Sequence, residues 1–124
     1  GKDSPARASS YEHVVGLFKD APNVKLVRGL LPESLGAVLL SQVAFLHLDL
    51  NLAHPEGDCF SALWPRMVLG AVAVLESYGF PGYEDCKDSL DAVARKLRIP
   101  ILSMPTGQGL AIKGICRNIQ NDSN

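Results

Sequence analysis

The sequence has little net charge, few aromatic residues and few cysteines. Its 124 residues contain 12 Lys and Arg against 13 Asp and Glu, giving a net charge of −1. This balance gives no indication of nucleic acid or an anionic membrane surface as a partner. No apolar run reaches the roughly 18 residues that a membrane-spanning helix needs. Hydrophobic residues nevertheless make up 47% of the chain, which is enough to form the core of one globular domain.

The three cysteines, Cys59, Cys86 and Cys116, lack the spacing of a metal site. Their odd number, without a recognisable secretory signal, predicts reduced thiols in a cytoplasmic protein. Residues 1–9 are polar and small, so we expect a flexible N-terminal arm. A single α/β domain is expected over residues 10–115, followed by a polar tail at 116–124.

Hydrophobic periodicity predicts an alternation of helices and strands along the domain. Helices are expected at 11–19, 33–40, 58–67 and 84–97, and strands at 24–28, 43–50, 71–76, 100–104 and 110–115. This order is typical of right-handed βαβ units. We therefore predict a small three-layer α/β unit with a mostly parallel sheet and a C-terminal antiparallel hairpin.

The stretch 43–51, V-A-F-L-H-L-D-L-N, is expected to form the central strand and the start of the loop after it. A continuous apolar run is typical of a strand that is buried on both faces. Ligands of open α/β sheets bind outside the carboxyl ends of such strands. His47 lies within the run and could be a metal ligand, but a hydrogen-bonded core histidine is the favoured interpretation.

Two carboxylates, Asp49 and Glu76, end the two most apolar strands. If these strands are neighbours, their ends lie about 4.8 Å apart. Two such acids could share a hard cation or orient a substrate hydroxyl. The alternative is that each acid caps the following helix or is solvated at its strand end. Tyr78, in the loop after Glu76, could line a ligand crevice.

Four sequence blocks occur in an order that resembles one known family. They read N-V-K-L-V-R-G-L-L-P-E-S-L, V-A-F-L-H-L-D-L-N-L, A-L-W-P-R-M-V-L-G-A-V-A-V-L-E-S-Y-G and P-G-Y-E-D-C-K-D-S-L-D. Through these blocks, residues 24–113 resemble the C-terminal half of class I S-adenosylmethionine-dependent methyltransferases, in the macrocin-type O-methyltransferase branch. The resemblance implies a Rossmann-like fold that is truncated here, with S-adenosylmethionine and Mg²⁺ as the family's cofactors.

The resemblance also implies a set of site residues. Acidic residues at two strand ends hold a divalent metal in the family, and Asp49 and Glu76 match one acid of each pair. Asn51 and Ser77 stand where the second acid of each pair is found. The resemblance therefore makes Asp49 and Glu76 the candidate metal ligands. Asn51, Ser77 and Tyr78 are expected to line the crevice.

The cofactor loop of the family has no counterpart in this sequence. The family binds S-adenosylmethionine with a glycine-rich turn after its first strand, ahead of the region matched here. No glycine-rich strand-to-helix turn occurs near the start of the sequence. We therefore assign no cofactor-binding or catalytic residue, and expect the chain alone to bind the cofactor poorly.

The missing part also affects the expected strand at 43–50. The family sheet order is 3-2-1-4-5-7-6, so the first two strands lie between the strands that match 24–28 and 43–50. Without them, strand 43–50 has an apolar, unpaired edge, which recruits other strands. Either strand 24–28 pairs there directly, or a second copy does, and we expect a homodimer or larger assembly.

These observations lead to three hypotheses about function. The first is a truncated, self-associating methyltransferase-like domain with little or no independent activity. The second is a small-molecule-binding or interaction module that uses the crevice at the strand ends. The third is part of an O-methyltransferase that another chain completes.

Overall fold

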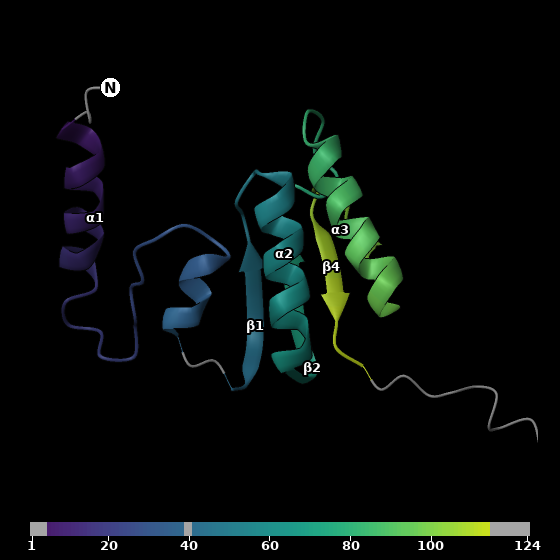
Figure 1. Cartoon of the computed structure of the whole chain (residues 1–124), viewed down its shortest axis with the longest axis horizontal. Coiled ribbons are helices and arrows are strands. Elements are labelled where there is room, and N and C mark those ends of the chain that lie inside the picture. Colours follow the sequence, from purple (N-terminus) through teal and green to yellow (C-terminus); the bar gives the residue numbers. More distant parts are fainter. Residues whose placement is uncertain (1–4, 39–40, 115–124) are drawn as a thin grey trace, which may run out of the picture. The chain divides into compact units, whose positions relative to one another are not determined.

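The structure, a computed structural model, describes residues 5–38 and 41–114, with side chains from Ser10 onward. Contacts divide the chain into two compact units, Gly1–Leu30 and Leu31–Asn124 (Figure 1). The division falls inside the single domain expected over residues 10–115. None of the described helices is long and apolar enough to cross a membrane.

The first unit contains helix α1, Pro5–Leu17, and an irregular segment after it. The structure places residues 5–9 in this helix, where an irregular arm was expected; proline suits a first helical turn because it has no N–H to lose. The prediction of a strand at 24–28 is wrong, because this segment is irregular and pairs with no strand among the described residues. Instead, the Val24 N–H donates to the Ala21 carbonyl, closing a turn around Pro22.

The second unit is built on a four-stranded sheet with the order β1-β2-β4-β3. The strands are β1 (Val43–Leu48), β2 (Met67–Leu75), β3 (Leu102–Ser103) and β4 (Gly109–Ile112). β1 and β2 are parallel, whereas β2–β4 and β3–β4 are antiparallel. The predicted α/β class and the C-terminal antiparallel hairpin are confirmed, and the sheet is mixed rather than mostly parallel.

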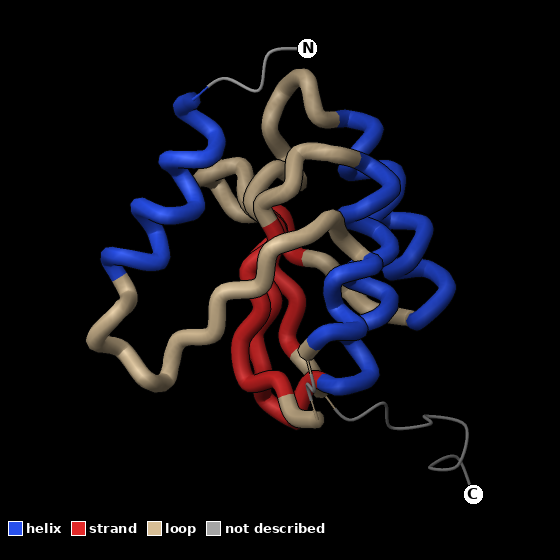
Figure 2. The backbone as a smooth tube through the Cα atoms, turned by 60° about the vertical axis from the view of Figure 1, so that its left-hand side comes forward, coloured by secondary structure: helices blue, strands red, loops and turns tan. Residues whose placement is uncertain are grey.

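The helices of this unit are η1 (Glu33–Ala37), α2 (Ala53–Leu63), η2 (Trp64–Arg66) and α3 (Glu84–Leu97). Figure 2 shows α2 and α3 packed together on one face of the strands. α3 has the predicted bounds. α2 begins at Ala53 rather than Asp58, with Glu56 in its first turn, where a carboxylate is favourable.

The core lies between the helices and the inner face of the sheet. Phe60 from α2, Leu75 from β2 and Leu90 from α3 are fully buried there. Ala73 and Ala111 are paired across β2 and β4 and are also fully buried, so small side chains face the helices at this point. Burial of apolar area against a close-packed interior is the main stabilising contribution to this unit.

The opposite face of the sheet, here called the open face, is much less buried. Strand alternation places Phe45, Val72 and Ile112 on this face, and the register aligns them. Phe45 is 62% exposed and Ile112 is 51% exposed. The prediction that β1 is central and buried on both faces is therefore wrong, because β1 is an edge strand. Within the second unit, α2 and α3 cover one face of the sheet.

Replacing Leu90 with Ala tests the location of this core. Leu90 is fully buried between α2, α3 and the sheet, so Leu90→Ala should lower the free energy of unfolding by about 2–5 kcal/mol. Urea denaturation followed by circular dichroism measures this change. Leu69→Ala is the matched control, because Leu69 is 65% exposed and should change the free energy by less than about 0.5 kcal/mol. Equal effects of the two substitutions would contradict the described core.

Candidate functional site

The carboxyl ends of β1 and β2 meet at one edge of the sheet. The Glu76 N–H donates to the Leu48 carbonyl at 2.9 Å, which holds the two strand ends side by side. Asp49, Glu76 and the residues that follow each of them lie at this edge. The structure then divides their side chains into separate groups.

Glu76 is the centre of the first group. Its Oε2 atom accepts hydrogen bonds from His47 Nε2 and Gln108 Nε2, each at 2.8 Å. These bonds favour the ionised form and hold the pKa of Glu76 below its ordinary value. His47 is hydrogen-bonded as expected, but it is exposed on the open face rather than buried in the core.

The geometry also determines which nitrogen of His47 faces the carboxylate. An ionised Glu76 can only accept, so His47 Nε2 must carry a hydrogen. Nδ1 is then the nitrogen available to other groups. A histidine oriented in this way by a carboxylate presents its second nitrogen to other groups.

Asn51 and Ser77 form the second group. The Ser77 hydroxyl donates to Asn51 Oδ1 at 2.5 Å. Asn51 has a φ of 60°, a left-handed conformation that asparagine tolerates better than most residues. The two predicted crevice residues therefore satisfy each other and join the loops that follow β1 and β2.

Tyr78 belongs to a third group, on the helix side of the sheet. Its hydroxyl donates to Asp91 Oδ1 at 2.6 Å, and Lys87 Nζ donates to Asp91 Oδ2 at 2.7 Å. Lys87 also lies 4.7 Å from the Tyr78 ring centroid. Burial, together with the neighbouring Asp91, raises the pKa of Tyr78. Tyr78 is 6% exposed, so most of the ring supports α3 and little of it faces a crevice.

Glycine at position 109 gives the Tyr78 ring its space. A Cβ atom at Gly109 would lie 2.7 Å from Tyr78 Cγ, which is closer than real contacts allow. The sequence gives no signal for this contact, because it depends on the register between β4 and the loop after β2.

A magnesium ion does not fit the predicted pair of ligands. Mg²⁺ requires a near-octahedral set of oxygen atoms. Glu76 Oε2 is already occupied by two N–H donors, and Asp49 is exposed at the edge of the sheet. Among the described residues, no group of three or more His, Cys, Asp or Glu side chains could hold a metal ion. We therefore assign no metal-dependent step to these residues.

Sequence reasoning missed two residues that support this edge. Gln108 is one of them, and only the strand register brings it to Glu76. The other is Glu56, which is fully buried and accepts the Leu50 N–H at Oε1 at 3.3 Å. The position of Glu56 in the first turn of a helix is a weak signal that could have identified this residue.

The buried Glu56 also affects the neighbouring Cys86. Burial of the Cys86 thiol, together with the nearby Glu56 side chain, raises the pKa of Cys86 to about 11, so this thiol is unreactive.

Comparison with known proteins shows similarity to methyltransferase structures. The O-methyltransferase NovP superposes with a TM-score of 0.71 at 17% identity, covering 84% of this chain and 45% of NovP. The apo structure of CalS11, a TDP-rhamnose 3′-O-methyltransferase of calicheamicin biosynthesis, gives 0.65 at 15% identity, covering 92% of this chain and 55% of CalS11. The chain thus spans about half the length of these structures. No family model and no curated protein sequence matches. The fold is therefore methyltransferase-like.

Replacing Glu76 with Gln tests its hydrogen bonds through the dependence of stability on pH. The pKa of Glu76 is lower in the folded chain than in the unfolded chain, so ionised Glu76 stabilises the fold at pH values above its unfolded-state pKa. This stabilisation is lost as the pH falls through the folded-state pKa. The wild-type chain should therefore lose stability below a pH of about 4.3. The Glu76→Gln variant should lose less stability than the wild type over the same pH range.

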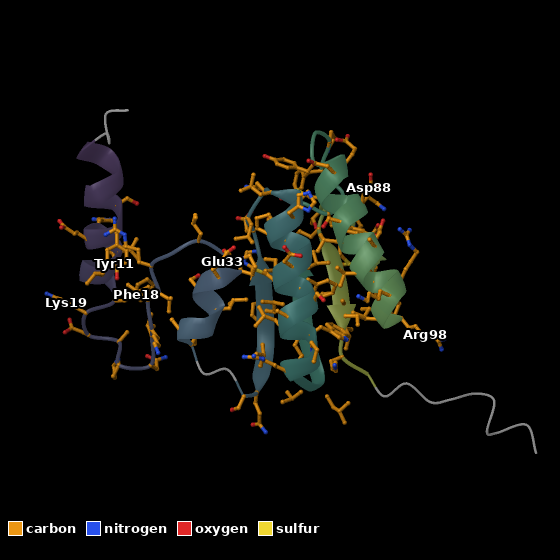
Figure 3. The ribbon with its side chains drawn as sticks, viewed as in Figure 1. Tyr11, Phe18, Lys19, Glu33, Asp88 and Arg98 are labelled. Carbon is orange, nitrogen blue, oxygen red and sulfur yellow. The ribbon has the colours of Figure 1, made fainter. Side chains whose placement is uncertain are left out.

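Urea denaturation at pH 7 and at pH 3.5 measures this difference. Glu33→Gln is the control, because Glu33 is an exposed carboxylate in η1 (Figure 3). If Glu76→Gln and Glu33→Gln show the same loss between the two pH values, the bonds to Glu76 do not contribute to stability.

Proposed function

We propose that this chain is a methyltransferase-like domain that self-associates through strand β1 and has little or no methyl-transfer activity alone. The observation that carries the proposal is the position of β1. It is the outer strand of the sheet and pairs only with β2 in the described part of the chain. An exposed strand edge of this kind offers backbone donors and acceptors to a further strand.

The side chains of β1 favour such pairing. Edge strands that avoid association carry lysine, proline or a shortened strand. The β1 sequence V-A-F-L-H-L contains neither lysine nor proline, and Phe45 is 62% exposed. A second strand at this edge would remove Phe45 and the outer backbone groups from water. Self-association is therefore the simplest way to complete the sheet.

Low independent activity is supported by the side chains at the strand ends. Glu76, Ser77 and Tyr78 each bond to another side chain of the same chain. The hollow lined by Tyr78, Phe80 and Lys87 measures about 250 Å³. This is below the range of about 300–1,000 Å³ for small-molecule pockets, which makes small-molecule binding in the hollow beside Tyr78 less favoured.

A second candidate is an O-methyltransferase part that another chain completes. It is favoured by the coverage of NovP and CalS11, since only 45% and 55% of their chains are matched. Under this hypothesis, β1 would pair with a strand of a chain that carries the cofactor loop.

We also infer a reducing cellular compartment, such as the cytoplasm. Cys59 and Cys86 are both buried as free thiols. Proteins in oxidising compartments commonly pair their cysteines.

Replacing Phe45 with Lys tests self-association at the β1 edge. The wild-type chain should sediment as a dimer or larger assembly at micromolar concentration. Phe45→Lys places a charge beside the edge and removes an apolar contact, so the dissociation constant should rise by roughly tenfold or more. Leu69→Lys is the matched control, because Leu69 is equally apolar, is 65% exposed and lies outside β1. A monomeric wild-type chain would overturn the proposal.

Titration with S-adenosylmethionine distinguishes the proposal from the second candidate. Isothermal calorimetry of the chain alone, with and without Mg²⁺, should give no saturable heat. Binding that appears only after a cofactor-loop half of a methyltransferase is added would favour the second candidate. Saturable binding by the chain alone would contradict the proposed low activity.

A further inference from the structure

A second hollow lies at the opposite end of β2 from Glu76. It is formed where α3 ends and where β4 leaves the sheet, beside η2. Its volume is about 560 Å³, more than twice that of the hollow beside Tyr78. This volume is within the usual range for small-molecule pockets of about 300–1,000 Å³. None of the strand-end residues discussed above lines it.

The wall of this hollow is mainly apolar. Trp64 from η2 and Ile99 from the segment after α3 are 8% and 7% exposed, so they form a firm base. Leu97, the last residue of α3, also lines the hollow. An aliphatic or aromatic body placed on these side chains would be removed from water together with them.

Two cationic side chains, Arg98 and Lys113, line the same hollow, and no acidic residue does. Lys113 Nζ donates to the Trp64 carbonyl at 2.9 Å and lies 4.9 Å from the Trp64 ring centroid. An ammonium group has three hydrogens, so two remain for another acceptor. These contacts hold the charge at the edge of the apolar wall.

Arg98 follows the last turn of α3, as Figure 3 shows. Its φ of 56° is a left-handed conformation, which turns the chain away from the helix axis. Across the described ranges, Arg98 makes no ion pair with an acidic side chain. A guanidinium group without such an ion pair can bind the carboxylate of a ligand with two parallel hydrogen bonds.

We propose that this hollow is a binding site for a small amphipathic carboxylate, with the apolar body on Trp64 and the carboxylate between Arg98 and Lys113. The charge of the site selects an anion, and the apolar wall selects a ligand with a hydrocarbon or ring body. Because the site contains no residue of β1, it is independent of the proposed self-association.

The single tryptophan of the sequence provides a direct measurement. Trp64 is the only tryptophan in the chain and forms the base of the hollow, so its emission reports ligand binding there. The full chain is titrated with sodium octanoate, a probe with an eight-carbon body and one carboxylate. Octanol serves as the matched neutral probe. We expect octanoate to cause a saturable change in Trp64 emission, at a concentration at least about tenfold below the concentration of octanol that is needed for the same change.

The variant Arg98→Gln tests the role of the guanidinium group. It should weaken octanoate binding by about tenfold and leave octanol unaffected, because the charge-assisted hydrogen bonds of the guanidinium group are lost. Lys96→Gln is the control, since Lys96 is an exposed cation in the last turn of α3 that does not line the hollow. The control should bind octanoate like the wild type, and added salt should weaken octanoate binding only.

A second variant, Leu97→Glu, places a negative charge in the wall of the hollow. It should abolish octanoate binding, and circular dichroism establishes that the variant is folded. Calorimetry repeats each titration without relying on Trp64 emission. Equal affinity for octanoate and octanol, or equal loss of octanoate binding in Arg98→Gln and Lys96→Gln, would overturn the proposal.

Discussion

The packing of α2 and α3 on one face of the sheet is the interaction on which the second unit depends. Phe60, Leu75 and Leu90 are fully buried in this layer, and the small Ala73 and Ala111 face the helices. Because both helices take the same face, the sheet has one well-covered side and one open side. This one-sided burial leaves Phe45 exposed on the open side, and the strand order places β1 at the edge of the sheet.

The end of β2 at Leu75 explains why the strand-end residues do not form one site. Residues 76–79 form a turn, so strand alternation no longer determines which side of the sheet each side chain occupies. Glu76 meets His47 and Gln108, and His47 lies on the open face, whereas Tyr78 meets Asp91 of α3 on the helix side. A resemblance in sequence can place these residues at one edge of the sheet, but it does not show which face each side chain occupies. The polar groups are hydrogen-bonded to other side chains of the chain, whereas a preorganised metal site would keep its oxygen atoms available for the ion.

Sequence reasoning predicted the elements whose signal is local. α3 has an apolar stripe, acidic residues in its first turn and basic residues in its last turn, and its bounds were predicted correctly. The segment 24–28 has a local preference for a strand, but a strand also needs a neighbour, and none is present in the structure. Burial of His47 was likewise predicted from a continuous apolar run. That pattern cannot distinguish a central strand from an edge strand with an apolar, exposed face.

The geometry of strand pairing links the exposed edge to the exposed face. Two copies that meet at the same edge of β1 around a twofold axis perpendicular to the sheet run antiparallel, and each keeps its open face on the same side. Phe45 of one copy then lies on the same face as Phe45 of the other, so both rings can pack against each other. A slip of one residue would instead bring Phe45 opposite a residue that faces the helices, which strand alternation excludes. Pairing at β1 would therefore complete the backbone hydrogen bonds and cover the most exposed aromatic side chain of the sheet in one step.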